Sequence, residues 1–210
     1  MRRTSPKRHD VPVTTDRMET FSDGVIAILI TIMVLELNVP DGGHLSSLHK
    51  VWPVFGSYVL SFVIIGIYWN NHHHMLRATE RINGAVLWAN LHLLFWLSLF
   101  PFGTAWMGER HIARTPTAVY GVILLAAAIA YYILHTLILR ELGPDSVLAL
   151  AIGRDTKGKL SPVIYTAGIL LTFVSRWVGL AAYVIVALMW LVPDRRLEPS
   201  LATAGNPRPH

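Results

Sequence analysis

Residues 17–39, RMETFSDGVIAILITIMVLELNV, place a cluster of polar residues directly in front of an apolar segment. Between Phe21 and Leu35 the only polar side chains belong to Ser22, Asp23 and Thr31. At about 1.5 Å per residue, a helix from Phe21 to Val39 covers roughly 28 Å, close to the roughly 30 Å of a bilayer's hydrocarbon core. A cleavable secretory signal is the alternative, but the preceding residues are numerous and polar and no small-x-small cleavage site follows Leu37. The segment therefore predicts a transmembrane helix.

Asp23 is the most informative residue of this segment. An ionised carboxylate inside a membrane span costs roughly 2.5 to 3.5 kcal/mol on insertion scales, so such a group normally faces a partner, the interior of a bundle or water. Alternatively, Ser22 and Asp23 cap a helix that begins there, which would leave Asp23 at the level of the lipid head groups. The spacing of the residues leaves both interpretations open.

The composition of the whole chain is that of a membrane protein. Of its 210 residues, 53% are hydrophobic and 15% are charged, and the mean hydropathy is +0.45. Soluble domains average roughly 45–50% apolar and about 25% charged residues. The absence of cysteine excludes disulfides and thiolate metal sites. The formal net charge of +5 comes from basic residues between apolar segments, so it indicates membrane orientation and not binding to nucleic acid.

Five more apolar segments follow the first along the chain. We expect helices over residues 51–69, 84–107, 117–139, 161–174 and 177–192. The last two are divided at Arg176, because a charge is costly in hydrocarbon but harmless at a turn. The sequence thus predicts an all-α polytopic membrane protein with six transmembrane helices in residues 17–193, between an N-terminal tail, residues 1–16, and a disordered C-terminal tail, residues 194–210.

The third apolar segment carries polar residues that need partners. Asn90 and His92 interrupt its apolar run, and we expect both to be buried and hydrogen-bonded. Pro101 should kink the last turn of this helix, because proline removes a backbone donor and clashes with the preceding turn.

The basic residues predict the orientation of the chain. With six spans both termini lie on the same side of the membrane. Of the 18 Lys and Arg residues, only four fall on the opposite side, namely Lys50, Arg110, Arg114 and Arg176. The positive-inside rule therefore places both termini in the cytoplasm, with the protein in the cell membrane.

Three motifs in the first three segments match the signature of a known family. They are Arg17-x-x-x-Phe21-Ser22-Asp23, Trp69-Asn-Asn71-His72-His73 and Asn90-x-x-x-x-Phe95-Trp96-x-Ser98-x-x-Pro101-Phe102. With these motifs the chain resembles the transmembrane protein 175 family of potassium channels, found in lysosomes and bacteria, as a bacterial member with a single repeat. The resemblance covers residues 17 to about 104, and the rest of the chain agrees only in hydrophobic pattern.

The resemblance implies a homotetramer in which the first helix of each subunit lines a central pore for potassium ions, other monovalent cations passing less well. It places the narrowest ring at Ile28, with Thr31, Ile32 and Leu35 on the same face of the helix. An apolar ring can gate by dewetting, and threonine hydroxyls can replace part of the hydration shell of potassium. Because every side of this helix is apolar, the same stripe would equally serve as core packing.

The remaining motif residues are expected to fix the first helix to the second and third. Arg17, Ser22 and Asp23 would otherwise be unpaired at membrane depth, and His72 and Asn90 are the expected partners. Phe21 belongs to the same motif.

Other functions find less support in the sequence. Three consecutive histidines, residues 72–74, lie about 100° apart around a helix and do not converge on a metal ion. We expect no metal and no cofactor, and no glycine-rich phosphate loop, GxSxG or HExxH motif indicates an enzyme. The alternative function is a proton-coupled transporter or a non-conducting membrane scaffold, with Asp23 and His72 as relay or packing groups.

Overall fold

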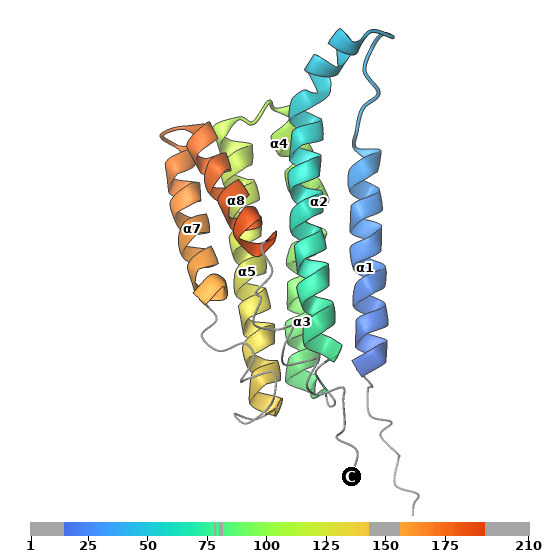
Figure 1. Cartoon of the computed structure of the whole chain (residues 1–210), viewed down its shortest axis with the longest axis vertical. Helices are drawn as coiled ribbons and strands as arrows, with labels where there is room; N and C mark the ends of the chain where they lie inside the picture. The colour runs from blue at the N-terminus through green and yellow to red at the C-terminus, as the bar shows by residue number, and fades with distance from the viewer. Residues whose placement is uncertain (1–14, 78, 80–81, 143–155, 192–210) are drawn as a thin grey trace, which may run out of the picture.

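The computed structural model describes residues 15–77, 79, 82–142 and 156–191, and the regular structure in these residues is entirely helical. The elements are α1 (Thr15–Leu35), a short 3₁₀ helix η1 (Leu45–Ser47), α2 (Leu48–Arg77), α3 (Gly84–Ser98), α4 (Phe100–Glu109), α5 (Arg114–Leu142), α7 (Thr156–Thr172) and α8 (Arg176–Leu191). Figure 1 shows the long helices side by side, with α1 at one edge of the bundle and the α7–α8 hairpin at the opposite side. The prediction of an all-α fold is confirmed.

Four helical segments in the described part of the chain are long and apolar enough to cross a membrane. They are Thr15–Leu35, Leu45–Arg77, Gly84–Glu109 and Arg114–Leu142. The last two helices are shorter, with 17 residues in α7 and 16 in α8. At about 1.5 Å per residue these two reach only roughly 25 Å, less than a full hydrocarbon core. Residues 1–14 and 192–210, which hold nearly all of both predicted tails, lie outside the described residues.

The start of α1 decides between the two interpretations of Asp23. The helix already contains Thr15, so Asp23 lies about two turns inside it and not at its end. Ser22 donates its hydroxyl proton to the carbonyl oxygen of Met18 at 2.8 Å, a bond within the helix. The interpretation of Ser22 and Asp23 as a helix cap is therefore wrong.

A break divides the third apolar segment into α3 and α4. It falls at Leu99, two residues before Pro101, and Pro101 lies in the first turn of α4. Proline is tolerated there, because the first backbone N–H groups of a helix have no partner within it. The predicted distortion is present, but it comes before the last turn of the expected helix. It separates α4, a helix of 10 residues, from α3.

The core is joined by polar contacts as well as apolar ones. Ser61 Oγ on α2 lies 2.6 Å from Thr104 Oγ1 on α4 and 2.8 Å from the Tyr120 hydroxyl on α5. The three side chains are buried, so these bonds satisfy groups that would be costly to leave unpaired. Next to Tyr120 on α5, Gly121 packs directly against the Tyr183 hydroxyl of α8, where a Cβ atom would overlap it. These contacts hold α2, α4, α5 and α8 as one scaffold, against which α1 packs with one side.

Candidate functional site

A chain of hydrogen bonds joins α1, α2 and α3 where they meet. Asn90 Nδ2 on α3 donates to Ser22 Oγ on α1 at 2.9 Å, and His72 Nε2 on α2 lies 2.7 Å from Asn90 Oδ1. The exposed fractions of Ser22, His72 and Asn90 are 0%, 1% and 1%. The structure thus brings together three of the residues named by the sequence motifs, and each belongs to a different helix.

The direction of these bonds fixes the proton on His72. Since the Ser22 hydroxyl proton goes to Met18, Ser22 Oγ accepts from the amide nitrogen of Asn90, and Asn90 presents its oxygen to His72. His72 therefore carries a proton on Nε2. Its Nδ1 is buried and has no hydrogen-bond partner among the described residues. A neutral imidazole supplies the one donor that the network requires.

Asp23 is paired with a different residue from the ones that the sequence indicated. Trp69 Nε1 donates to Asp23 Oδ1 at 3.0 Å, whereas neither His72 nor Asn90 contacts this carboxylate by a hydrogen bond in the described structure. Trp69 lies one helical turn before His73 on α2, and the two rings stack with centroids 5.8 Å apart. Trp69 was quoted as a motif residue, and its indole N–H was the available donor that the sequence reasoning overlooked.

One turn below Asp23, Glu19 extends the same contact between α1 and α2. His73 Nδ1 lies 2.6 Å from Glu19 Oε1, close enough for an ion pair although it is not aligned as a hydrogen bond. Within the described residues, no three His, Cys, Asp or Glu side chains are placed to hold a metal ion.

Arg17 and Phe21 stand apart from this network. Arg17 is exposed and makes no hydrogen bond or ion pair within the described part of the chain. Phe21 is 56% exposed. The network expected to include Arg17 therefore does not reach it in a single subunit.

His92 is placed differently from the prediction. It lies on the exposed side of α3, where it accepts a hydrogen bond from Trp96 Nε1 at 2.9 Å. The expectation of burial is wrong, because Asn90 already occupies the side of α3 that faces α1 and α2. His92 points away from that side, and the next turn of its own helix supplies the partner.

The opposite face of α1 carries the residues that were assigned to a constriction. The buried residues of α1 are Met18, Ser22, Ile26, Leu29 and Met33. Ile28, Thr31 and Leu35 lie on the other side, with Ile28 57% and Leu35 81% exposed. Ile32 is 39% exposed and lies at the margin between the two faces. Thr31 Oγ1 donates to the carbonyl oxygen of Ile28 at 2.8 Å.

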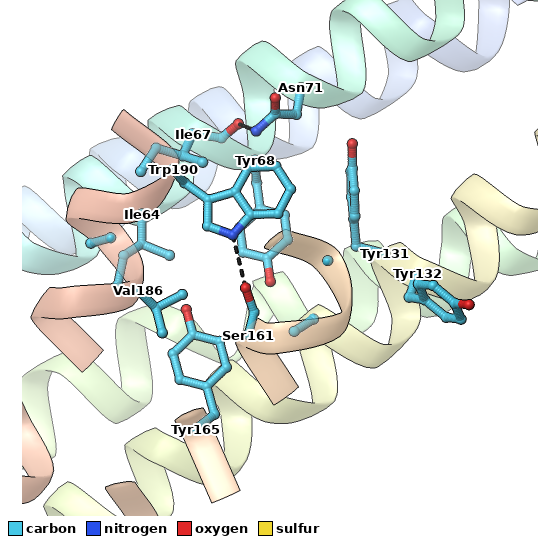
Figure 2. A pocket seen from close by; sticks show the side chains of 13 residues that line it. Ile64, Ile67, Tyr68, Asn71, Tyr131, Tyr132, Ser161, Tyr165, Val186 and Trp190 are labelled. Atoms are coloured by element: carbon cyan, nitrogen blue, oxygen red, sulfur yellow. Dashed lines mark hydrogen bonds between the residues drawn. The ribbon is translucent and has the colours of Figure 1, made fainter. Parts of the chain in front are cut away.

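A small cavity lies on the other side of the scaffold, between α2, α5, α7 and α8 (Figure 2). Its volume is about 40 Å³, which has room for only a few water molecules. Tyr68 and Tyr165 line it, and Trp190 Nε1 donates to Ser161 Oγ across it at 2.9 Å. The cavity does not touch α1, so it is separate from the exposed stripe.

Known proteins share both this sequence and this fold. The family described as the endosomal/lysosomal potassium channel TMEM175 matches residues 17–101. A potassium channel of a Chryseobacterium species is 50% identical over 189 residues, which cover 90% of this chain and 98% of that protein. The chain belongs to the TMEM175 family. A potassium channel of Streptomyces collinus is 32% identical over 185 residues, covering 83% of this chain and 90% of that protein.

Among solved structures, the crystal structure of a lysosomal potassium-selective channel TMEM175 homolog from Chamaesiphon minutus matches with a TM-score of 0.73. It is 32% identical, and the match covers 85% of this chain and 96% of that chain. The region that matches the TMEM175 family ends at Pro101, so α1, α2 and α3 carry the signature, while α5, α7 and α8 are shared with the full-length relatives. This TMEM175 family member is thus a multi-pass membrane protein from a family of ion channels, which is not an enzyme class.

Proposed function

We propose that the protein is a potassium-permeable cation channel in which four copies surround a pore lined by α1. Relatives at 50% and 32% identity are named potassium channels, and the solved relative is titled a potassium-selective channel. A bundle with α1 at its edge (Figure 1) cannot enclose a path alone, so a closed ring of copies is required. Potassium is the expected permeant ion, with other monovalent cations passing less well.

The observation that carries this proposal is the kind of side chain on the uncovered face of α1. Gly24, Ala27 and Thr31 are exposed there, beside the larger Phe21, Ile28 and Leu35. The exposed side of α3 and α4 carries more large aromatic residues than this face does, with exposed fractions of 75% for Trp88, 55% for Phe95 and 58% for Phe102. Bulky apolar side chains suit lipid, whereas small residues allow helices to approach one another closely. The α1 face is therefore suited to meeting its own copies around an axis.

Within the proposed pore, Ile28 forms the narrowest ring and excludes water when the ring is closed. Thr31, Ile32 and Leu35 continue the lining from Ile28 toward the end of the helix. The Thr31 hydroxyl proton is used by the carbonyl of Ile28, so the lone pairs of its oxygen remain available to a cation. A ring of such oxygens would replace part of the hydration shell of potassium.

The motif residues have a supporting role in this proposal. Ser22, Asn90 and His72 hold one side of α1 through the buried network, and Asp23 adds the bond to Trp69. Arg17 and Phe21 lie on the exposed side, where a neighbouring copy in the proposed tetramer would meet them.

The test compares potassium flux into liposomes for Ile28→Asn and Ile185→Asn. Ile185 on α8 is 55% exposed, close to the 57% of Ile28, so the two variants make the same change at matched exposure. If Ile28 lines the pore, its amide variant stabilises water in the ring, raises leak and weakens discrimination between potassium and sodium. Ile185→Asn, which faces lipid in this arrangement, should leave the flux per folded tetramer unchanged.

The same assay separates the other functions. A scaffold shows no flux in the wild type or in either variant. A proton-coupled transporter moves protons in fixed proportion to potassium, which a pH indicator inside the liposomes detects. Equal flux from both variants, with equal loss of thermal stability, would mean that Ile28 faces lipid.

We further propose that the channel resides in the cell membrane with both termini in the cytoplasm. Protease accessibility of an epitope at each end in intact cells tests this orientation.

A further inference from the structure

An open groove separates α1 from α4 near the end of the bundle where α1 stops. Its volume is about 680 Å³, within the roughly 300–1,000 Å³ typical of sites for small molecules. Leu29 and Ile32 of α1 form one wall, and Phe102 and Trp106 of α4 contribute to the other. The buried network of Ser22, Asn90 and His72 belongs to other residues of α1, so this groove is a separate feature.

Two carboxylates lie in this otherwise apolar groove. Glu36 follows the last residue of α1, and Glu109 is the last residue of α4. Both are exposed, and neither takes part in an ion pair or a hydrogen bond within the described residues. No basic residue lines the groove, although Arg110 follows Glu109 in the chain. The groove therefore presents uncompensated negative charge next to an apolar and aromatic surface.

We propose that this groove is a binding site for a small amphiphilic organic monocation. The ammonium group would lie between Glu36 and Glu109 and against the Trp106 ring, because aromatic rings and carboxylates both attract cations. The apolar part of the molecule would cover Leu29 and Phe102. A hydrated potassium ion gains no favourable contact from these apolar walls, so the chemistry of the groove favours an organic cation.

The charge of the groove also favours a free amine over a lipid head group. Phosphatidylcholine and phosphatidylethanolamine carry an ammonium group, but an adjacent phosphate makes the head group neutral overall. The two carboxylates of the groove would repel this phosphate. Binding of the amine in the groove does not depend on ion conduction through the proposed pore. Ile32 lies both in the groove and at the margin of the proposed pore stripe, so an occupant would touch the helix that we propose to line the pore.

The experiment measures binding of 3-phenylpropylamine to the purified oligomer in lipid-free detergent by isothermal titration calorimetry at neutral pH. Two probes separate the parts of the site: 3-phenylpropan-1-ol keeps the ring and lacks the charge, and propylamine keeps the charge and lacks the ring. We expect both to bind at least about 10-fold more weakly than the aromatic amine. Raising the salt concentration should weaken binding of the amine, because the groove is open to solvent.

The variants Glu36→Gln and Glu109→Gln test the carboxylates. Each should weaken binding of the aromatic amine by about 2- to 5-fold, and the double variant by about 4-fold or more, as expected for exposed charge pairs. Asp16→Asn removes one negative charge in the first turn of α1, far along the helix from the groove, and should change binding by less than about 2-fold. Equal binding by the wild type and the double variant overturns the proposal, and so does equal binding of the alcohol.

A lipid arm completes the test. Added phosphatidylethanolamine should not compete with the amine, and strong competition would assign the groove to lipid. Because the readout is heat of binding, failure here leaves the flux experiment on Ile28 unaffected, and absence of flux leaves this result unaffected.

Discussion

Replacing Asn90 with leucine tests the buried network with a nearly matched volume. Asn90 is 1% exposed and provides both the donor to Ser22 Oγ and the acceptor for His72 Nε2. In the variant Ser22 keeps its bond to Met18, but His72 loses the only hydrogen bond that its Nε2 makes in the described structure. The lost bond to Ser22 at about 0.5–1.5 kcal/mol and the stranded His72 donor at about 1–3 kcal/mol, offset by the added apolar burial, give about 1–3 kcal/mol per subunit.

The expected result is a large fall in thermal stability. For a chain of this size about 1 kcal/mol corresponds to roughly 2–4 °C, so the midpoint of unfolding should fall by roughly 2–12 °C. Scanning fluorimetry of the purified oligomer measures the shift, and Asn38→Leu, at an exposed position after the end of α1, is the control that should change little.

A double-mutant cycle sharpens the comparison. Ser22→Ala removes the acceptor of the same Asn90 bond, so its effect and that of Asn90→Leu should add to clearly more than the effect of the double variant. An Asn90→Leu oligomer as stable as the wild type, or strictly additive effects, would refute the network as a source of stability.

Two further substitutions test the scaffold and the pore lining. Gly121→Ala should lower the midpoint of unfolding, measured by scanning fluorimetry, by several degrees, because the new Cβ overlaps the Tyr183 hydroxyl. Gly66→Ala is the control: its Cβ meets nothing within 4 Å, so the variant should be neutral or slightly stabilising. Thr31→Val keeps the shape of the side chain without its oxygen, so potassium flux relative to sodium flux in liposomes should fall at near-normal stability. Unchanged selectivity would remove Thr31 from the ion path that begins at Ile28.

Burial cost explains how much of the site the sequence could predict. A polar side chain in an apolar segment must find a partner, and that argument, together with the family motifs, led to Ser22, His72 and Asn90, which the structure joins. The same argument gave the wrong environment for His92, because an apolar neighbourhood in sequence does not say which side of a helix faces the bundle. Only the packing of α3 against α1 and α2 shows that residue 92 points outward.

The fold was predicted best where apolar runs are long. The first four segments are about as long as a bilayer crossing or longer, and helices cover all four. The second helix extends beyond the expected range to Arg77, and the third segment is divided at Leu99. The C-terminal hairpin was harder, because residues 161–192 are too short for two full spans. The turn before Arg176 agrees with the prediction, while α7 begins at Thr156 and continues through Pro162. Pro162 is the seventh residue of α7, where proline removes one backbone hydrogen bond, so a helix that begins before it was not expected.

The contacts of α1 differ along its length, and this difference separates the roles of its residues. Its first half is held by hydrogen bonds of Ser22 and Asp23 and by the close contact of Glu19 with His73. Its second half makes one polar contact to another helix among the described residues, the weak one between the Met33 sulfur and Thr104 Oγ1 at 3.9 Å. The groove toward α4 is open there. Because buried hydrogen bonds stabilise far more than a sulfur contact of this length, changes near residue 22 should act on stability and assembly. Substitutions on the exposed face of α1 from Ile28 onward disturb few contacts within the subunit. A change in flux caused by such a substitution therefore reports on the proposed pore and not on folding.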